Sequence, residues 1–193
     1  MKQMLFNRMS GIVTLSLVAL SFTNCTKNVK EDSQMMQGMK MRSEKSLNLT
    51  KTYTANLQAL NHSGVSGTAS LMLEGNMLTV KIDAMGLEAN KLHPQHIHGF
   101  MENNRNSTCP DMSADTNGDG LVDLPEGLPS YGAVLLELTP FPTADANGEI
   151  HYTKTFTIDG SVLPLQNRAI VLHGLTVMNQ YWPTLPVACA QIK

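Results

Sequence analysis

Apolar and polar residues alternate along the chain from Thr52 onward. In residues 67–73 the side chains of Ala69, Leu71 and Leu73 fall on one face. Residues 77–83 repeat this pattern after the turn sequence Glu74-Gly75-Asn76. Because successive side chains of a strand point to opposite faces, the period of two predicts a β-hairpin with one buried side.

Further short strands are predicted at residues 132–138, 149–158, 168–173 and 186–192. The segment Tyr181-Trp182-Pro183 is expected to precede the last strand. It forms either a plug that packs into the core, which is the preferred interpretation, or an exposed recognition edge. No long helical period is present. Short strands separated by turn residues therefore predict an all-β fold, a Greek-key β-sandwich or barrel.

The N-terminal segment follows a different pattern. Lys2 and Arg8 precede a short apolar run at residues 9–22. The run is too short to span a membrane, and this arrangement is typical of a signal peptide. Cys25 follows directly, in a context that resembles the lipidation site of bacterial lipoproteins. The alternative is an ordinary secretory signal with an incidental cysteine.

Three regions follow from this pattern: a signal peptide at 1–24, a lipidated Cys25 with a flexible polar tether at 25–50, and a β-domain at 51–193. The protein is expected to be held at a bacterial membrane by its lipid, within the cell envelope. The tether contains four methionines, whose thioethers suit Cu(I), although a linker that happens to be methionine-rich is the preferred interpretation. They are Met35, Met36, Met39 and Met41.

Charge and cysteine content narrow the possible partners and compartments. The formal net charge is −2 and no segment forms a basic stripe, so nucleic acid is not expected as a partner. Of the three cysteines, a lipidated Cys25 leaves Cys109 and Cys189 as one pair. Export favours a disulfide between them over two buried free thiols.

Histidines form the first group that could bind a metal. His96 and His98 are two residues apart, so on a strand both side chains point to the same side. His173 ends the apolar run 168–173 and is either a satisfied core residue or a ligand. Three imidazoles from two strands suit copper or zinc. His93 precedes this group and is separated from the strand by Pro94.

Residues 115–126 fit the twelve-residue calcium loop of EF-hands. Oxygen ligands fall at positions 1, 3, 5, 9 and 12, a glycine stands at position 6, and the residue at position 7 offers its carbonyl. The expected ligands are Asp115, Asn117, Asp119, Leu121, Asp123 and Glu126. Flanking helices are not expected, since Cys109-Pro110 precedes and Gly127-Leu128-Pro129 follows. The alternative is an acidic turn that binds nothing.

Together, these motifs resemble the copper/zinc superoxide dismutase family over roughly residues 52–193. His96-Ile97-His98 followed by Cys109 is similar to that family's copper-binding strand and first disulfide cysteine. Residues 143–148 resemble its turn after the metal loop, residues 168–173 its late strand ending in a copper ligand, and residues 187–190 the strand with its second cysteine. Residues 67–99 also resemble the CHRD domain, a bacterial β-module ending in His-x-His.

Two departures from the dismutase pattern bear on activity. Between Cys109 and the late strand the only histidine is His151, so the bridging histidine and the zinc ligands are missing and zinc is not expected. Pro186 stands where the family has a guiding arginine. Three functions remain open: a copper-only dismutase, a non-catalytic copper-binding protein for storage or delivery, and a calcium-stabilised structural or adhesion module.

Overall fold

The computed structural model describes residues 49–102 and 105–193. The predicted signal peptide, Cys25 and the tether methionines lie outside the described residues. The first strand begins at Lys51, the residue at which the sequence predicts the domain to start. Within the described ranges, no helix is long and apolar enough to span a membrane.

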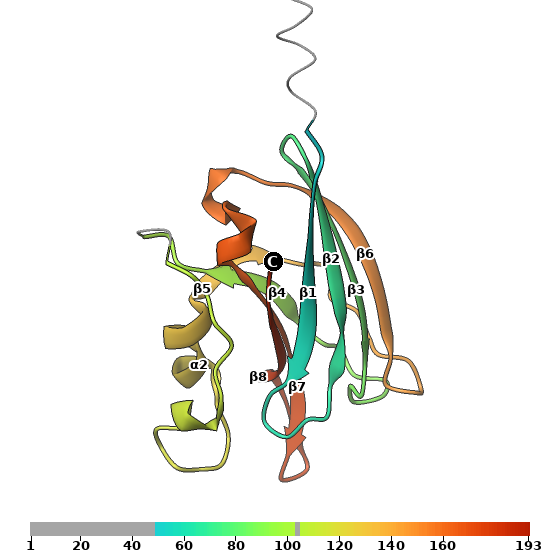
Figure 1. Ribbon diagram of the computed structural model, residues 1–193. Helices are drawn as coiled ribbons and strands as arrows, with labels where there is room; N and C mark the ends of the chain where they lie inside the picture. Colours follow the sequence, from blue (N-terminus) through green and yellow to red (C-terminus); the bar gives the residue numbers. More distant parts are fainter. Residues whose placement is uncertain (1–48, 103–104) are drawn as a thin grey trace, which may run out of the picture. The chain divides into compact units, whose positions relative to one another are not determined.

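In the described residues of the domain, eight antiparallel strands are present (Figure 1). In sequence order they are β1 (Lys51–Ala59), β2 (Ser66–Glu74), β3 (Met77–Met85), β4 (Gln95–Gly99), β5 (Ala133–Glu137), β6 (Ile150–Thr157), β7 (Ala169–Val177) and β8 (Gln180–Gln191). Their order across the sheet is β5-β4-β7-β8-β1-β2-β3-β6. The predicted all-β class is therefore confirmed.

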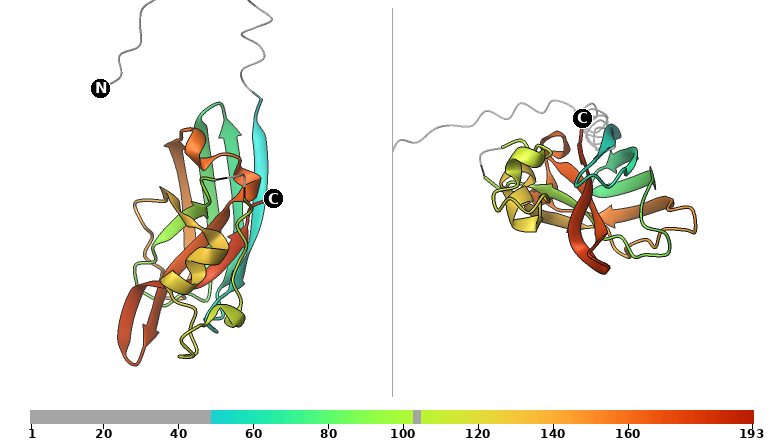
Figure 2. Two further views of the ribbon diagram at one scale, coloured as in Figure 1. Left: turned by 90° about the vertical axis from the view of Figure 1, so that its left-hand side faces the viewer. Right: turned by 90° about the horizontal axis from the view of Figure 1, so that it is seen from below.

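The sheet has two halves that enclose one core. β1, β2, β3 and β6 form one half, β4, β5, β7 and β8 form the other, and the halves join where Gln58 and Ala59 pair with β8. The chain crosses between halves after β3, β5 and β6, which is a Greek-key connection pattern. Figure 2 shows the two halves from two further directions. Leu71 and Val80 of one half share a buried cluster with Ile97 and Ile170 of the other.

The hairpin formed by β7 and β8 is longer than the sequence predicts. β7 continues to Val177 and β8 begins at Gln180, with the turn residues Met178 and Asn179 at positive φ. The expectation that Trp182 packs into the core is wrong, because its side chain lies within β8 and is 47% exposed. The reason is topological: β4 covers β7 only from Ala169 to Leu172, so the outer hairpin has no third strand beside it.

A helix, α2 (Leu124–Tyr131), begins within the last three residues of the acidic loop and continues beyond it, so the expectation of no flanking helix is wrong. Asp123 caps its first turn by accepting from the backbone N–H of Glu126, whose side chain accepts from the N–H of Asp123 in return. This capping box starts the helix despite the glycine and proline that suggest a loop. Three short 3-10 helices complete the fold: η1 (Met112–Ala114), η2 (Gly160–Val162) and η3 (Leu165–Asn167).

Candidate metal site

The three predicted histidines lie on the face of the β4–β7 pair that points away from the main core. On β4, Ile97 faces the core, so His96 and His98 face outward. On β7, Leu172 is a core residue, so its neighbour His173 projects to the same outer side as the two β4 histidines. Alternation within two paired strands thus brings together side chains that are 75 residues apart in sequence.

One ring nitrogen of each of His96, His98 and His173 lies within 4.8 Å of the others. The ring centroids are separated by 5.6 Å for His96 and His98, 5.1 Å for His96 and His173, and 5.9 Å for His98 and His173. His98 and His173 are buried and His96 is half-buried. The predicted convergence of the three imidazoles is therefore present.

Backbone carbonyls fix the protonation of two of the rings. Nδ1 of His98 donates to the carbonyl of Gly132 at 2.9 Å, and Nδ1 of His173 donates to the carbonyl of Thr184 at 3.0 Å. A carbonyl only accepts, so each Nδ1 carries the proton and each Nε2 keeps a free lone pair. Metal-binding histidines are commonly oriented by such second hydrogen bonds.

One further nitrogen on each of the three rings has no hydrogen-bond partner among the described residues. Nε2 of His98, Nε2 of His173 and Nδ1 of His96 are all buried and unpaired. Leaving several lone pairs buried together is costly unless a ligand satisfies them. The three atoms belong to the residues of the histidine group, so they form a ready donor set for one cation.

Burial keeps these imidazoles neutral. Desolvation lowers the pKa of His96, and it lowers the pKa of His98 to about 4 and that of His173 to about 3. The carbonyls of Gly132 and Thr184 favour the charged forms, but burial outweighs them. The lone pairs are therefore available for a metal at neutral pH.

Two aromatic residues that the sequence analysis missed pack against the histidines. Phe141 meets the His96 ring edge to face at 5.3 Å, and Tyr131 of α2 meets the His98 ring at 4.7 Å. The Tyr131 hydroxyl is buried without a partner among the described residues, and burial raises its pKa. Nothing in the local sequence marks either residue, because their contact with the site depends on how loops fold over β4.

Gly132 supplies the carbonyl that orients His98, and only glycine fits this position. Its φ is +84°, and a side chain would collide with the backbone of Gly99. Glycine is common directly after the C-terminus of a helix, and Gly132 has this position after α2. Its presence could therefore have been anticipated if the helix had been predicted. The carbonyl's role in the site is visible only in three dimensions.

The other histidines lie outside this group. Nδ1 of His93 is 2.9 Å from the carbonyl of His173 and Nε2 is 3.1 Å from the carbonyl of Glu88, so this ring braces the backbone next to the site. His151 pairs with Asp83 at 2.8 Å on an exposed strand face. The hydrogen bond with the Asp83 carboxylate is the main reason that the pKa of His151 is raised.

A disulfide joins Cys109 to Cys189, as predicted from the cysteine content. It ties the segment before η1 to β8, next to Val171 on the outer face. Asn61 adds a second tie, since its amide donates to the carbonyls of Val122 and Pro186 and accepts from the N–H of Val122. Both links fasten the segment that leads to α2, and α2 carries Tyr131 over His98.

Pro186 is the residue paired with His173 across the β7–β8 hairpin. The position at which the resemblance expects a guiding arginine thus lies beside the histidines and carries no charge. Among the described residues the histidine group is the one set of three or more metal-binding side chains that converge.

The side chains of the acidic loop accept hydrogen bonds from the loop's own backbone. Asp115 accepts from the N–H groups of Gly118 and Gly120, and Asp119 accepts from that of Leu121. Asn117 accepts from the N–H of Asp119, and Glu126 accepts from those of Thr116 and Asn117. No three of the carboxylates converge as the histidines do within the part of the chain that the structure describes. Calcium binding by this loop stays a prediction.

Comparison with known proteins adds little to this picture. No family model matches the chain, and no curated protein sequence matches it. Among solved structures, the chain is similar to superoxide dismutase 5 of Candida albicans in its Cu(II) form. The identity is 15%, the TM-score is 0.39, and the match covers 75% of this chain and 92% of that one.

Proposed function

We propose that this protein binds copper through His96, His98 and His173 and holds it at the cell envelope. The observation that carries the proposal is the set of three buried, unpartnered ring nitrogens, two of them on rings oriented by backbone carbonyls. Packing alone does not account for such a group, because its buried nitrogens have no hydrogen-bond partners. A cation bound by imidazoles satisfies all three at once.

Copper fits this donor set better than the other common metals. Neutral imidazoles suit copper and zinc, whereas calcium and magnesium need oxygen ligands. Cu(II) stands above zinc in the usual affinity order for such ligands. When bound, copper would supply one-electron redox chemistry. The chain's own contribution is to orient the rings, to keep them neutral and to cover them with Phe141 and Tyr131.

Copper holding, for storage or delivery, is favoured over superoxide dismutation. Superoxide is an anion, and a cation beside the metal would attract it. The position opposite His173 is Pro186, and Glu137 is the residue paired with His96 on β5. The copper-loaded protein is therefore expected to convert superoxide no faster than free copper. A clearly faster, protein-dependent rate would favour the copper-only dismutase instead.

The proposal also includes export and a lipid anchor at Cys25. The disulfide is consistent with an oxidising compartment outside the cytosol. The anchor rests on the sequence around Cys25 alone, and mass measurement of the membrane-extracted protein would test it. In the same proposal calcium orders the loop 115–126, whose acidic residues shape it through hydrogen bonds to its own backbone.

Calorimetric titration of the full-length protein with Cu(I), Cu(II) and Zn(II) tests the copper site. One copper ion is expected to bind the wild type, and a His96→Ala/His98→Ala variant is expected to lose this site. His151→Ala is the matched control, since its ring lies on another face and pairs with Asp83. Replacing the four tether methionines with leucine separates thioether binding from the histidine site.

The proposal fails if the double variant binds copper as tightly as the wild type. It also fails if Zn(II) displaces Cu(II) at equal concentration. For the bound Cu(II), electron paramagnetic resonance should detect nitrogen ligands that disappear in the double variant. Loss of the signal in His151→Ala as well would point to a general unfolding of the protein rather than to a defined site.

A further inference from the structure

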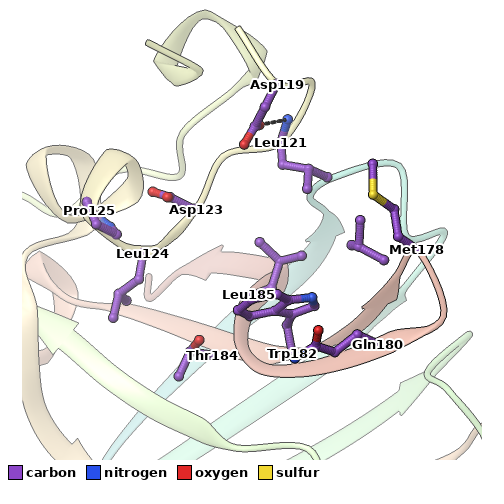
Figure 3. A pocket seen from close by; sticks show the side chains of 11 residues that line it. Asp119, Leu121, Asp123, Leu124, Pro125, Met178, Gln180, Trp182, Thr184 and Leu185 are labelled. Carbon is purple, nitrogen blue, oxygen red and sulfur yellow. Dashed lines mark hydrogen bonds between the residues drawn. The ribbon is translucent and has the colours of Figure 1, made fainter. Parts of the chain in front are cut away.

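A cavity of about 450 Å³ lies between the acidic loop and the outer part of the β7–β8 hairpin (Figure 3). Asp119 and Asp123 approach it from the loop, and Trp182 and Leu185 line it from β8. Met178 at the hairpin turn and Gln180 at the start of β8 also line it. The volume is within the range of sites that bind small organic molecules.

The charge of the lining has one sign. It contains the carboxylates of Asp119 and Asp123 and no lysine, arginine or histidine. Each carboxylate uses one oxygen for the backbone: Asp119 accepts from the N–H of Leu121 at 2.9 Å, and Asp123 accepts from that of Glu126 at 3.1 Å. The second oxygen of each remains available to a ligand. An anion is therefore disfavoured in this cavity and a cation is favoured.

The opposite wall is apolar and includes an exposed aromatic ring. Trp182 is 47% exposed although it lies in a regular strand, and Leu185 beside it is buried. The face of an indole ring attracts ammonium and guanidinium groups, most strongly where water is partly excluded. The apolar wall would accept the hydrocarbon body of such a ligand.

We propose that this cavity binds an organic cation with a compact apolar body. Its charged nitrogen lies between Asp119, Asp123 and the Trp182 ring, and its hydrocarbon part covers Leu185 and Met178. The proposal does not rest on copper binding, because none of the three histidines lines the cavity. It adds a second binding site, which is lined by Thr184, the residue whose carbonyl orients His173.

The chain's single tryptophan is the wall of the cavity, so its fluorescence reports binding directly. The full-length protein is titrated with choline and, separately, with 3,3-dimethylbutan-1-ol, which has nearly the same shape without the charge. The buffer is calcium-free, because calcium would compete with choline for Asp119 and Asp123. In the described structure the loop's own hydrogen bonds hold both residues in place without an ion. Choline is expected to change the emission saturably and to bind about tenfold more tightly than the neutral alcohol, because only choline carries a charge that the Trp182 ring and the two carboxylates attract.

An Asp119→Asn/Asp123→Asn variant removes both charges and keeps an oxygen to accept from Leu121 and Glu126, so the helix cap survives. Its choline affinity should fall by part of that tenfold, because the two carboxylate charges are gone and the Trp182 ring remains. Its affinity for the alcohol should not change. Glu137→Gln, an exposed carboxylate on β5, is the matched control and should bind choline like the wild type. Thermal melting checks that each variant is folded.

Calorimetry with Trp182→Leu provides a readout that does not depend on fluorescence, and choline binding should be lost. Three results would overturn the proposal: equal affinity for choline and the alcohol, unchanged choline affinity in the double amide variant, or no saturable response to choline in the wild type. Loss of copper binding with intact choline binding would affect only the copper proposal.

Discussion

Nδ1 of His173 donates a hydrogen bond to the backbone carbonyl of Thr184 across the β7–β8 hairpin, at 3.0 Å. This contact leaves the other nitrogen of the ring buried, unprotonated and without a partner in the described structure. The long hairpin therefore determines which nitrogen of His173 faces the site. His98 has the same arrangement with Gly132, so two rings from different strands present Nε2 to one point.

Replacing His98 with leucine should separate the cost of the apo site from the gain on metal binding. His98→Leu removes an unsatisfied buried nitrogen and loses the bond to Gly132, so the apo stability should change by less than about 1 kcal/mol. In the wild type, copper at a hundredfold excess over its dissociation constant should add about 2.7 kcal/mol. Thermal melting with and without copper measures both effects. Equal stabilisation of the variant by copper would contradict the assignment of His98 as a ligand.

The stability of the metal-free protein should fall as the pH falls below about 6.5. His98 and His173 have lowered folded-state pKa values, about 4 and about 3. In this pH range these two residues therefore bind more protons in the unfolded chain than in the folded protein, which favours unfolding. The slope is at most about 1.4 kcal/mol per pH unit for each histidine and ends at the folded-state pKa values. Well above pH 6.5 both rings are neutral in both states and their effect vanishes.

Urea unfolding at a series of pH values measures this slope. In a His98→Leu/His173→Leu variant, the free energy of unfolding should depend clearly less on pH between pH 4 and 6.5. In the lower half of this pH range, His151→Ala should keep the slope of the wild type. Equal slopes for the double variant and the wild type would mean that other groups control the acid sensitivity.

Opening the disulfide should destabilise the domain and weaken copper binding. Cys109 and Cys189 are 80 residues apart, and closing such a loop contributes about 4–5 kcal/mol in the chain-entropy model. A Cys109→Ser/Cys189→Ser variant should lose stability of about that size in denaturant unfolding. Its copper affinity should also fall, because the segment that carries Tyr131 over His98 is released. Unchanged copper affinity in a folded variant would show that the disulfide supports only the fold.

Calcium should raise the melting temperature if the loop 115–126 binds it. With a dissociation constant of about 1 mM, typical of the weakest extracellular sites, 10 mM calcium would add about 1.4 kcal/mol. Asp119→Ala should abolish the effect and leave the β-domain folded, since its described contact is a local bond to Leu121. Identical melting curves in calcium and in chelator would mean that the loop is only an acidic turn.

Local sequence determined the elements that depend on a regular period. Alternation in residues 66–85 is sufficient to give the β2–β3 hairpin and its buried face, because side chains of a strand alternate wherever the strand lies. The same rule puts His96 and His98 on one side of β4. The pairing of Cys109 with Cys189 followed from counting cysteines in a chain that its sequence predicts to be exported.

Tertiary structure decided how these elements meet. His173 reaches the β4 histidines only because β7 pairs with β4, and strand pairing between distant segments leaves no local period to detect. The protonation of the rings depends on carbonyls of Gly132 and Thr184, which every residue possesses and no sequence pattern marks. Trp182 is exposed because β4 ends before the hairpin does. Burial depends on which segments are neighbours in space. The sequence therefore determines which side chains share one face of a strand, and only the tertiary structure determines which other residues surround that face.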